Sequence, residues 1–150
     1  MKVKEVILGV VFGLCLVMSS CEEEEIEDIE SVLPNDEVEG DARDRFEGTW
    51  TVTETGKLLG VRNFVVNVSK DDEFRDRVNI SNFYLIGNSD TIIATVSSIL
   101  VSTITIQDQT VNSTKYSGLG DMENDQKINF DYFVDDGNDN KDTISAVFVR

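Results

Sequence analysis

The chain has 150 residues, of which 13 are Lys or Arg and 29 are Asp or Glu, so its formal net charge is −16. Proteins that bind nucleic acid need a basic surface for the phosphate backbone, and this composition argues against that class. The chain has no histidine, which excludes Ser-His-Asp and Cys-His nucleophiles and the commonest metal ligand. We therefore expect a protein that is not an enzyme, with no catalytic residue, no metal and no cofactor.

Residues 1–20 have the pattern of a secretory signal. Lys2 and Lys4 supply a positive start, residues 6–18 are apolar apart from two glycines, and two serines precede Cys21. A transmembrane helix needs about 18 or more apolar residues, so this segment is too short to remain as a span. The pattern resembles the bacterial lipoprotein signal peptide, although Met18 stands where that family usually has Leu. The resemblance implies cleavage before Cys21 and a diacylglycerol on its thiol. The alternative is an ordinary signal peptide that happens to precede a cysteine.

A lipid on Cys21 would hold the protein in one leaflet of a membrane. One acyl chain gives only marginal membrane binding, whereas two or more anchor a protein stably.

Loss of residues 1–20 removes Lys2, Lys4 and Glu5 and leaves 11 basic and 28 acidic residues, a net charge of −17. It also removes Cys15, so neither a disulfide nor a zinc site is expected. The large charge favours a soluble monomer.

The segment after Cys21 is strongly acidic. Seven of the nine residues in 22–30 are Asp or Glu, and such a block repels itself and anionic lipid and cannot fold by burial. It resembles the acidic export signal of lipoproteins in one group of Gram-negative bacteria, which implies a surface-exposed outer-membrane lipoprotein. A plain charged spacer on the periplasmic side is the alternative. We assign residues 21–45 to a lipidated acidic tether, with a short helical turn at 41–45, and residues 46–150 to one domain.

From residue 46 onward, short β-branched and aromatic runs alternate with Gly, Asn and Asp clusters, and no 3.6-residue period is visible. Strands are expected at 48–55, 61–69, 77–86, 91–97, 99–107, 113–118, 126–134 and 142–149. Turns are expected at 69–72, 87–90, 118–121 and 135–138, where Gly, Asn or Asp adopts positive φ readily. About eight short strands without helices between them predict an all-β, antiparallel up-and-down meander. Such a meander closes as a barrel or, alternatively, splits into a β-sandwich.

Two segments lack a clean alternation of apolar and polar residues. In 78–86 apolar residues occur on both faces of the expected strand, and in 92–106 the apolar phase slips near 96–101. A bulge, a tight turn near Ser97 and Ser98, or burial on both faces would each explain the pattern. The sequence alone does not choose among these three.

A short motif lies at the start of the first expected strand. Gly48 and Trp50, in Gly-x-Trp spacing, resemble the first signature of the lipocalins, whose up-and-down barrels hold small apolar ligands. The resemblance implies that Trp50 closes one end of the barrel and that a late arginine, here Arg150, packs across its indole. Antiparallel pairing of the first and last strands would make the two residues neighbours. The lipocalins' Thr-Asp-Tyr signature is missing, and the domain is shorter than typical members.

Six residues are assigned to the barrel core or ligand-binding site: Trp50, Phe64, Phe130, Tyr132, Phe148 and Arg150. The expected function is non-catalytic binding of a small apolar ligand in the barrel mouth. The alternative is an accessory or structural lipoprotein that docks onto an outer-membrane protein or a glycan. A cavity near Trp50 would favour ligand binding, and a filled core with exposed Tyr84 or Tyr116 would favour docking.

Acidic residues are the last candidates for chemistry. Residues 135–142 offer the oxygen ligands that Ca²⁺ takes, but Tyr132 and Val134 would stand at the first and third EF-hand positions, so a solvated hairpin turn is expected. Glu54 and Asp131 are the only strand candidates for a glycosidase pair, and we assign both to a charged outer face.

Two Asp-Thr-Ile triplets match a short O-glycosylation pattern of exported bacterial proteins. They place candidate glycosylation at Thr91 and Thr143. The alternative is that both threonines simply begin strands.

Overall fold

The computed structural model describes residues 40–138 and 140–150, so Cys21, the signal segment and the acidic segment lie outside the described residues. Within these two ranges the chain forms eight strands and two 3-10 helices. The strands are β1 (Gly48–Gly56), β2 (Gly60–Lys70), β3 (Arg77–Ser81), β4 (Thr91–Val96), β5 (Thr103–Val111), β6 (Thr114–Asn124), β7 (Lys127–Asp135) and β8 (Lys141–Val149). The 3-10 helices are η1 (Ala42–Arg45) and η2 (Phe83–Leu85). Among the described helices, none is long and apolar enough to cross a bilayer.

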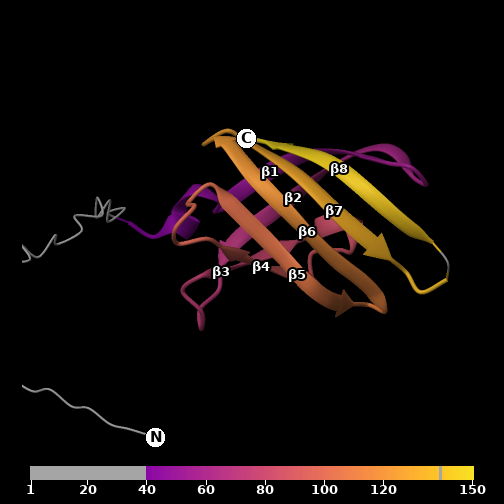
Figure 1. The fold of residues 1–150 in the computed structure, drawn as a ribbon, viewed down its shortest axis with the longest axis horizontal. Helices are drawn as coiled ribbons and strands as arrows, with labels where there is room; N and C mark the ends of the chain where they lie inside the picture. Colours follow the sequence, from indigo (N-terminus) through magenta and orange to yellow (C-terminus); the bar gives the residue numbers. More distant parts are fainter. Residues whose placement is uncertain (1–39, 139) are drawn as a thin grey trace, which may run out of the picture. The chain divides into compact units, whose positions relative to one another are not determined.

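Each strand pairs antiparallel with the next, and β8 pairs with β1, so the sheet closes into a barrel (Figure 1). The predicted all-β up-and-down meander is therefore confirmed as a barrel, and the β-sandwich alternative is wrong. Where β1 and β8 close the barrel, Val52 of β1 pairs with Phe148 of β8. Side chains alternate between the two faces of a strand, so every second residue, mostly apolar, points into the barrel.

Apolar side chains fill the barrel interior. In β1, Trp50 and Val52 are fully buried, whereas Thr49 and Thr51 between and beside them are exposed. Fully burying one large apolar side chain contributes about 1.5–3 kcal/mol, so this packing is the main source of stability. The apolar core consists of Phe46, Trp50, Val52, Phe64, Val66, Val68, Val78, Ile80, Phe83, Ile92, Ala94, Val96, Ile104, Ile106, Tyr116, Met122, Ile128, Phe130, Tyr132, Val134, Ile144, Ala146 and Phe148.

The third strand is shorter than the sequence predicts. It ends at Ser81, and the expected extension to residue 86 is wrong because Asn82, Tyr84 and Leu85 have left-handed φ angles of 57°, 54° and 65°. The Asn82 side chain accepts a hydrogen bond from the backbone N–H of Gly87 and so closes the loop. The apolar residues seen on both faces of 78–86 thus belong to a strand followed by a loop that turns into the barrel.

The second irregular segment contains a tight turn. The Ser97 hydroxyl accepts hydrogen bonds from the N–H groups of Ile99 and Leu100, at 3.3 and 2.9 Å, and β5 begins only at Thr103. Of the three explanations left open, the turn near Ser97 therefore applies. A register shift between Ile106 and Gln109 follows within β5, which continues to Val111 rather than ending at residue 107.

The turn predicted at 118–121 is wrong, because these residues lie inside β6. Gly118 stands opposite Tyr132, and Gly120 stands opposite Phe130, across the β6–β7 ladder. A Cβ atom on Gly118 would lie 2.5 Å from Cβ of Tyr132, and one on Gly120 would lie 2.6 Å from the Phe130 ring. These glycines give space to two interior rings rather than reversing the chain.

Trp50 and two arginines close one end of the barrel. The indole N–H of Trp50 donates to the Phe46 carbonyl at 2.8 Å, and the guanidinium carbon of Arg150 lies 4.3 Å from the centroid of the Trp50 ring. The Arg150 guanidinium also donates to the carbonyls of Arg45, Glu47 and Asp125. The structure thus places Arg150 across the indole, the contact that the lipocalin resemblance implies.

Arg43, in η1, ties the chain entry to the same closed end. It is buried and donates to the carbonyls of Asp71 and Phe74 at 2.9 Å each. It also pairs with Asp41, and this hydrogen-bonded ion pair holds the pKa of the Asp41 carboxyl well below its usual range. In Figure 1 the described chain enters at this end, in indigo, and the end of β7 and the start of β8 lie at the other end.

Candidate ligand site at the barrel mouth

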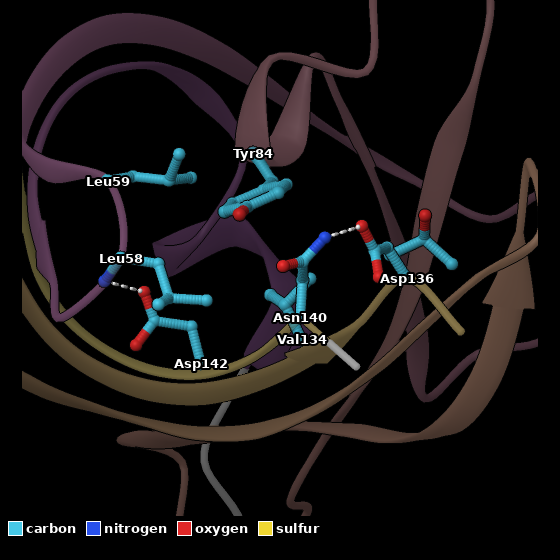
Figure 2. Close-up of a pocket in the computed structure, with 8 residues that line it drawn as sticks. Leu58, Leu59, Tyr84, Val134, Asp136, Asn140 and Asp142 are labelled. Carbon is cyan, nitrogen blue, oxygen red and sulfur yellow. Dashed lines mark hydrogen bonds between the residues drawn. The ribbon is translucent and has the colours of Figure 1, made fainter. Parts of the chain in front are cut away.

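The end opposite Trp50 carries the β1–β2 hairpin, the loops 82–90 and 112–113, residues 136–138 and Asn140, which together form the mouth of the barrel. A pocket of about 420 Å³ opens there (Figure 2). This volume is within the range of small-molecule sites, roughly 300–1,000 Å³. The pocket is lined by Leu58, Leu59, Tyr84, Thr114, Val134, Asp136, Asn140 and Asp142.

Asp142 positions the leucine side of the pocket. Its carboxylate accepts hydrogen bonds from the backbone N–H groups of Lys57 and Leu58, at 2.9 and 2.8 Å, and so fixes the tip of the β1–β2 hairpin (Figure 2). Asp142 is only 4% exposed. Burial opposes its ionisation, but the N–H groups of Leu58 and Lys57 outweigh burial and hold its pKa below the usual range. Gly56 leaves room for this carboxylate, since a Cβ there would lie 2.6 Å from an Asp142 oxygen.

The β7–β8 turn forms the opposite, polar rim. The Asn140 amide donates to Asp136 at 2.8 Å (Figure 2), and the backbone N–H of Asn138 donates to the same carboxylate at 2.9 Å. The Asn140 hydrogen bond is the main reason that the pKa of Asp136 lies below its usual value. The described part of the turn therefore bonds its acidic oxygens internally. In the described ranges, no group of three or more His, Cys, Asp or Glu side chains is placed to hold a metal ion.

A buried charged cluster lies beneath the pocket. Glu54 is 1% exposed and accepts hydrogen bonds from Nε of Arg62, at 2.6 Å, and from the hydroxyl of Tyr132. The Arg62 guanidinium carbon lies 4.3 Å from the centroid of the Tyr84 ring. Burial, reinforced by the Glu54 carboxylate, raises the pKa of Tyr132. Arg62 is thus held between a carboxylate and the aromatic ring that lines the pocket.

Glu54 was expected on a charged outer face, and that prediction is wrong. It has the same parity as Trp50 and Val52 and therefore faces the barrel interior, where Arg62 neutralises it. Asp131 is exposed, as expected for an outer face, and accepts a hydrogen bond from the Ser145 hydroxyl at 2.6 Å.

The six residues assigned to the core or ligand site do not line the pocket. Trp50, Phe64, Phe130, Tyr132 and Phe148 are all buried in the barrel, and Arg150 lies at the closed end. Trp50 has no exposed surface, and the pocket lies at the opposite end of the barrel. Of the two tyrosines whose exposure would favour docking, Tyr116 is 3% exposed, and Tyr84 is half-buried with its pKa raised by that burial.

The pocket residues carried only weak signals in the sequence. Leu58 and Leu59 lie in a hairpin between two glycines, where apolar residues are unusual and indicate a contact surface. The remaining lining residues come from strand ends, and only the fold brings them together. Thr91 begins β4 and Thr143 lies near the start of β8, and both are exposed.

Comparisons with known proteins support the fold alone. No protein-family model matches the chain, and no curated protein matches it. It is similar to the solved structure of a redesigned β-barrel, b11L5F_LGL, with 18% identity and a TM-score of 0.52 over 73% of this chain and 95% of that one. It is also similar to the structure of EF1p2_mFAP2b bound to DFHBI, with 19% identity and a TM-score of 0.50 over 73% of this chain and 97% of that one.

Proposed function

We propose that the protein binds a small, largely apolar ligand in the mouth of its barrel. The observation that carries this proposal is the pocket of about 420 Å³, in which Leu58, Leu59 and Val134 face a few polar groups. Small-molecule sites typically combine apolar walls with a few polar groups that orient the ligand. The barrel EF1p2_mFAP2b, which has a similar fold, is bound to DFHBI, so the architecture is compatible with a ligand.

The filled interior sets the position of the ligand. Buried aromatic side chains fill the barrel interior, and Trp50 and Phe83 have no exposed surface at all. A ligand in the mouth therefore lies above Arg62 and against Tyr84, rather than beside Trp50. We expect an apolar body against the leucines and a hydrogen-bonding group toward Thr114 or Asn140.

We further propose that Cys21 carries the lipid of an outer-membrane lipoprotein and that the protein is exposed on the surface of a Gram-negative cell. The described chain begins at residue 40, at the closed end, opposite the pocket. An anchor N-terminal to Gly40 would leave the mouth accessible from the medium.

Metabolic labelling with palmitate tests the anchor, since Cys21→Ser should abolish labelling. Proteolysis of intact cells tests exposure, and a barrel that resists protease until lysis would overturn it.

Binding in the mouth is tested with the neutral fluorescent probe N-phenyl-1-naphthylamine. Thr114→Trp places a large ring in the pocket wall, whereas Thr51→Trp places the same ring on the outer face of β1. We expect the wild type and Thr51→Trp to bind equally and Thr114→Trp to bind at least tenfold more weakly. Equal affinity in all three proteins, or no binding to the wild type, would overturn the proposal.

Exposed apolar side chains at the mouth favour docking onto an outer-membrane protein as a second candidate function. Val61, Leu58, Leu85 and Leu59 are 64%, 54%, 49% and 46% exposed. Exposed apolar residues that cluster mark interaction sites. Val61→Asp puts a charge on this exposed apolar surface and should abolish in-cell crosslinking to such a partner. Because Val61 does not line the pocket, probe binding should be unchanged. An unchanged crosslinking pattern would argue against docking.

A further inference from the structure

The β3–β4 hairpin is joined to the rest of the barrel over short ladders. β2 pairs with β3 only along Asn67–Lys70, although β2 itself runs from Gly60 to Lys70. β4 pairs with β5 only through Thr95 and Val96. By contrast, β1 pairs with β2 along its whole length. β4 therefore separates from β5 as it approaches the mouth, whereas β3 stays paired with β2 until it ends at Ser81 and leaves the upper part of β2 without a β3 partner.

Two amide side chains replace the missing ladder bonds. On one side, the Asn82 amide donates to the Val65 carbonyl at 2.8 Å. On the other, the Gln109 amide donates to the Ile93 carbonyl at 2.6 Å and accepts from the Ile93 N–H at 3.0 Å. These side chains are held less firmly than a continuous ladder, because each loses rotamer freedom when it binds. The upper hairpin is thus attached by contacts that can open individually.

The loop of this hairpin places Phe83 at the centre of the barrel, with no exposed surface. The Phe83 ring centroid lies 4.6 Å from that of Tyr132 and 6.0, 6.2 and 6.5 Å from those of Phe130, Tyr116 and Phe148. Four aromatic rings therefore surround a fifth that arrives on a loop rather than a strand.

The backbone that carries Phe83 is unfavourable by itself. Tyr84 and Leu85 have positive φ angles, which are uncommon for residues other than glycine and are outliers for bulky side chains. Such residues persist only where surrounding contacts hold them, and they concentrate at functional sites. Here the interior contacts of Phe83 hold the loop, so anything that replaces the Phe83 ring releases it.

We propose that Phe83 occupies a second ligand site and that a planar aromatic ligand of one or two fused rings replaces it when the β3–β4 loop withdraws. The site is built from four rings: Tyr116 and Phe130 meet the Phe83 ring edge to face, and Tyr132 and Phe148 are tilted against it. Aromatic rings in such offset and edge-to-face arrangements attract a flat ring. The inference rests on the proposed function, since Tyr84, next to Phe83, lines the mouth pocket through which the ligand enters. The ligand shifts the loop only by binding the withdrawn state better.

The test follows Phe83 directly in the full-length protein. We would incorporate 4-fluorophenylalanine at position 83 and titrate the otherwise wild-type protein with 2-naphthol, recording the ¹⁹F spectrum. At saturation the resonance should move to the position seen for the unfolded, solvent-exposed ring. Binding with an unmoved resonance, or no binding at all, would overturn the proposal.

Three variants measure the cost of withdrawal. Phe83→Ala removes the competing ring and should bind 2-naphthol at least tenfold more tightly than the wild type. Asn82→Ala removes a bond that holds the loop and should tighten binding about threefold. Phe83→Trp fills the site and should reduce interior binding at least tenfold. Equal affinities across the wild type, Phe83→Ala and Phe83→Trp would overturn the second site.

Thr114→Trp separates this inference from the proposed function. If this variant loses 2-naphthol binding and the wild-type ¹⁹F resonance never moves, the mouth site stands and the interior site is overturned. If the resonance moves in the wild type and in Thr114→Trp alike, and N-phenyl-1-naphthylamine also binds both proteins equally, the interior site stands and the mouth pocket serves only as its entrance.

Discussion

The buried Glu54–Arg62 pair gives the sharpest prediction of stability. Arg62→Met keeps a long apolar side chain but removes the guanidinium that bonds to Glu54. Glu54 is 1% exposed, so the variant leaves a carboxylate in the interior with only the Tyr132 hydroxyl as a partner. Removing one member of a buried ion pair typically costs about 3–5 kcal/mol, because the remaining charge is uncompensated.

The expected magnitude for this protein is at the lower end of that range. The Arg62 side chain is 23% exposed, so water compensates part of the loss, and we expect Arg62→Met to lower the free energy of unfolding by about 3 kcal/mol. The double variant Glu54→Leu with Arg62→Met removes both charges. We expect it to lie within about 1 kcal/mol of the wild type, since apolar replacement of a buried pair is often neutral.

Urea unfolding followed by circular dichroism measures all four corners of this double-mutant cycle. A deficit below about 1 kcal/mol at pH 7, the value of a surface pair, would refute the reasoning. So would a double variant that is less stable than Arg62→Met.

Three further predictions concern the two ends of the barrel and its glycines. Asp142→Asn should lower the free energy of unfolding at pH 7 by about 1.5–3 kcal/mol, because a charged acceptor of two N–H bonds is lost. Since the pKa of Asp142 is lowered in the folded protein, this contribution is present above the unfolded pKa and is lost as the pH falls through the folded pKa, so urea unfolding at pH 7 and pH 3 should show a shrinking difference. Gly118→Ala should cost about 1–3 kcal/mol by overpacking against Tyr132, measured by thermal unfolding. Arg150→Met should cost about 1–2 kcal/mol and change the near-ultraviolet circular dichroism of Trp50, since it removes the cation–π contact.

Each of the three predictions has an outcome that would contradict it, and Gly118→Ala has a matched control variant. An Asp142→Asn deficit that is the same at both pH values would contradict the role given to its charge. Leu119→Ala, on the exposed outer face beside Gly118, should cost under about 0.5 kcal/mol, and an equal loss for Gly118→Ala would remove the steric argument. Unchanged stability in Arg150→Met would mean that the closed end holds without its arginine.

The barrel itself was predictable because its strands alternate apolar and polar residues over most of their length. The first strand was expected at 48–55 and is Gly48–Gly56, and the last was expected at 142–149 and is Lys141–Val149. In both strands one face is buried and the other is exposed to solvent, which fixes the pairing register of the strands. The Gly-x-Trp motif gave the further expectation of a lipocalin-like barrel rather than a sandwich.

Other features depend on partners that are distant in sequence. Gly118 and Gly120 were interpreted as a turn because glycine favours turns, whereas their true role is set by the rings of β7 that they face. Glu54 was placed outside because it is charged, although its alternation with Trp50 indicates the interior. Only Arg62, eight positions later on the neighbouring strand, makes that interior position tolerable.

The mouth was the least predictable part of the fold. Phe83 enters the barrel on a loop whose residues have left-handed backbone angles. The spacing of apolar residues in the sequence does not predict such a loop. The pocket combines residues from β1–β2, η2, β6 and β7–β8. These residues are far apart in the sequence, so the pocket could be identified only once the fold was known.

The central claim, that the barrel mouth holds a small molecule, is tested most directly by native mass spectrometry of the barrel, released by proteolysis near residue 40 from protein isolated from its own cells. The spectrum is recorded before and after organic extraction. The account predicts a discrete mass in excess of the polypeptide that disappears on extraction and is absent from Thr114→Trp. The bare polypeptide mass before extraction, or that mass with sugar alone, would contradict the account and direct attention to the exposed leucines and Val61 as a protein-binding surface.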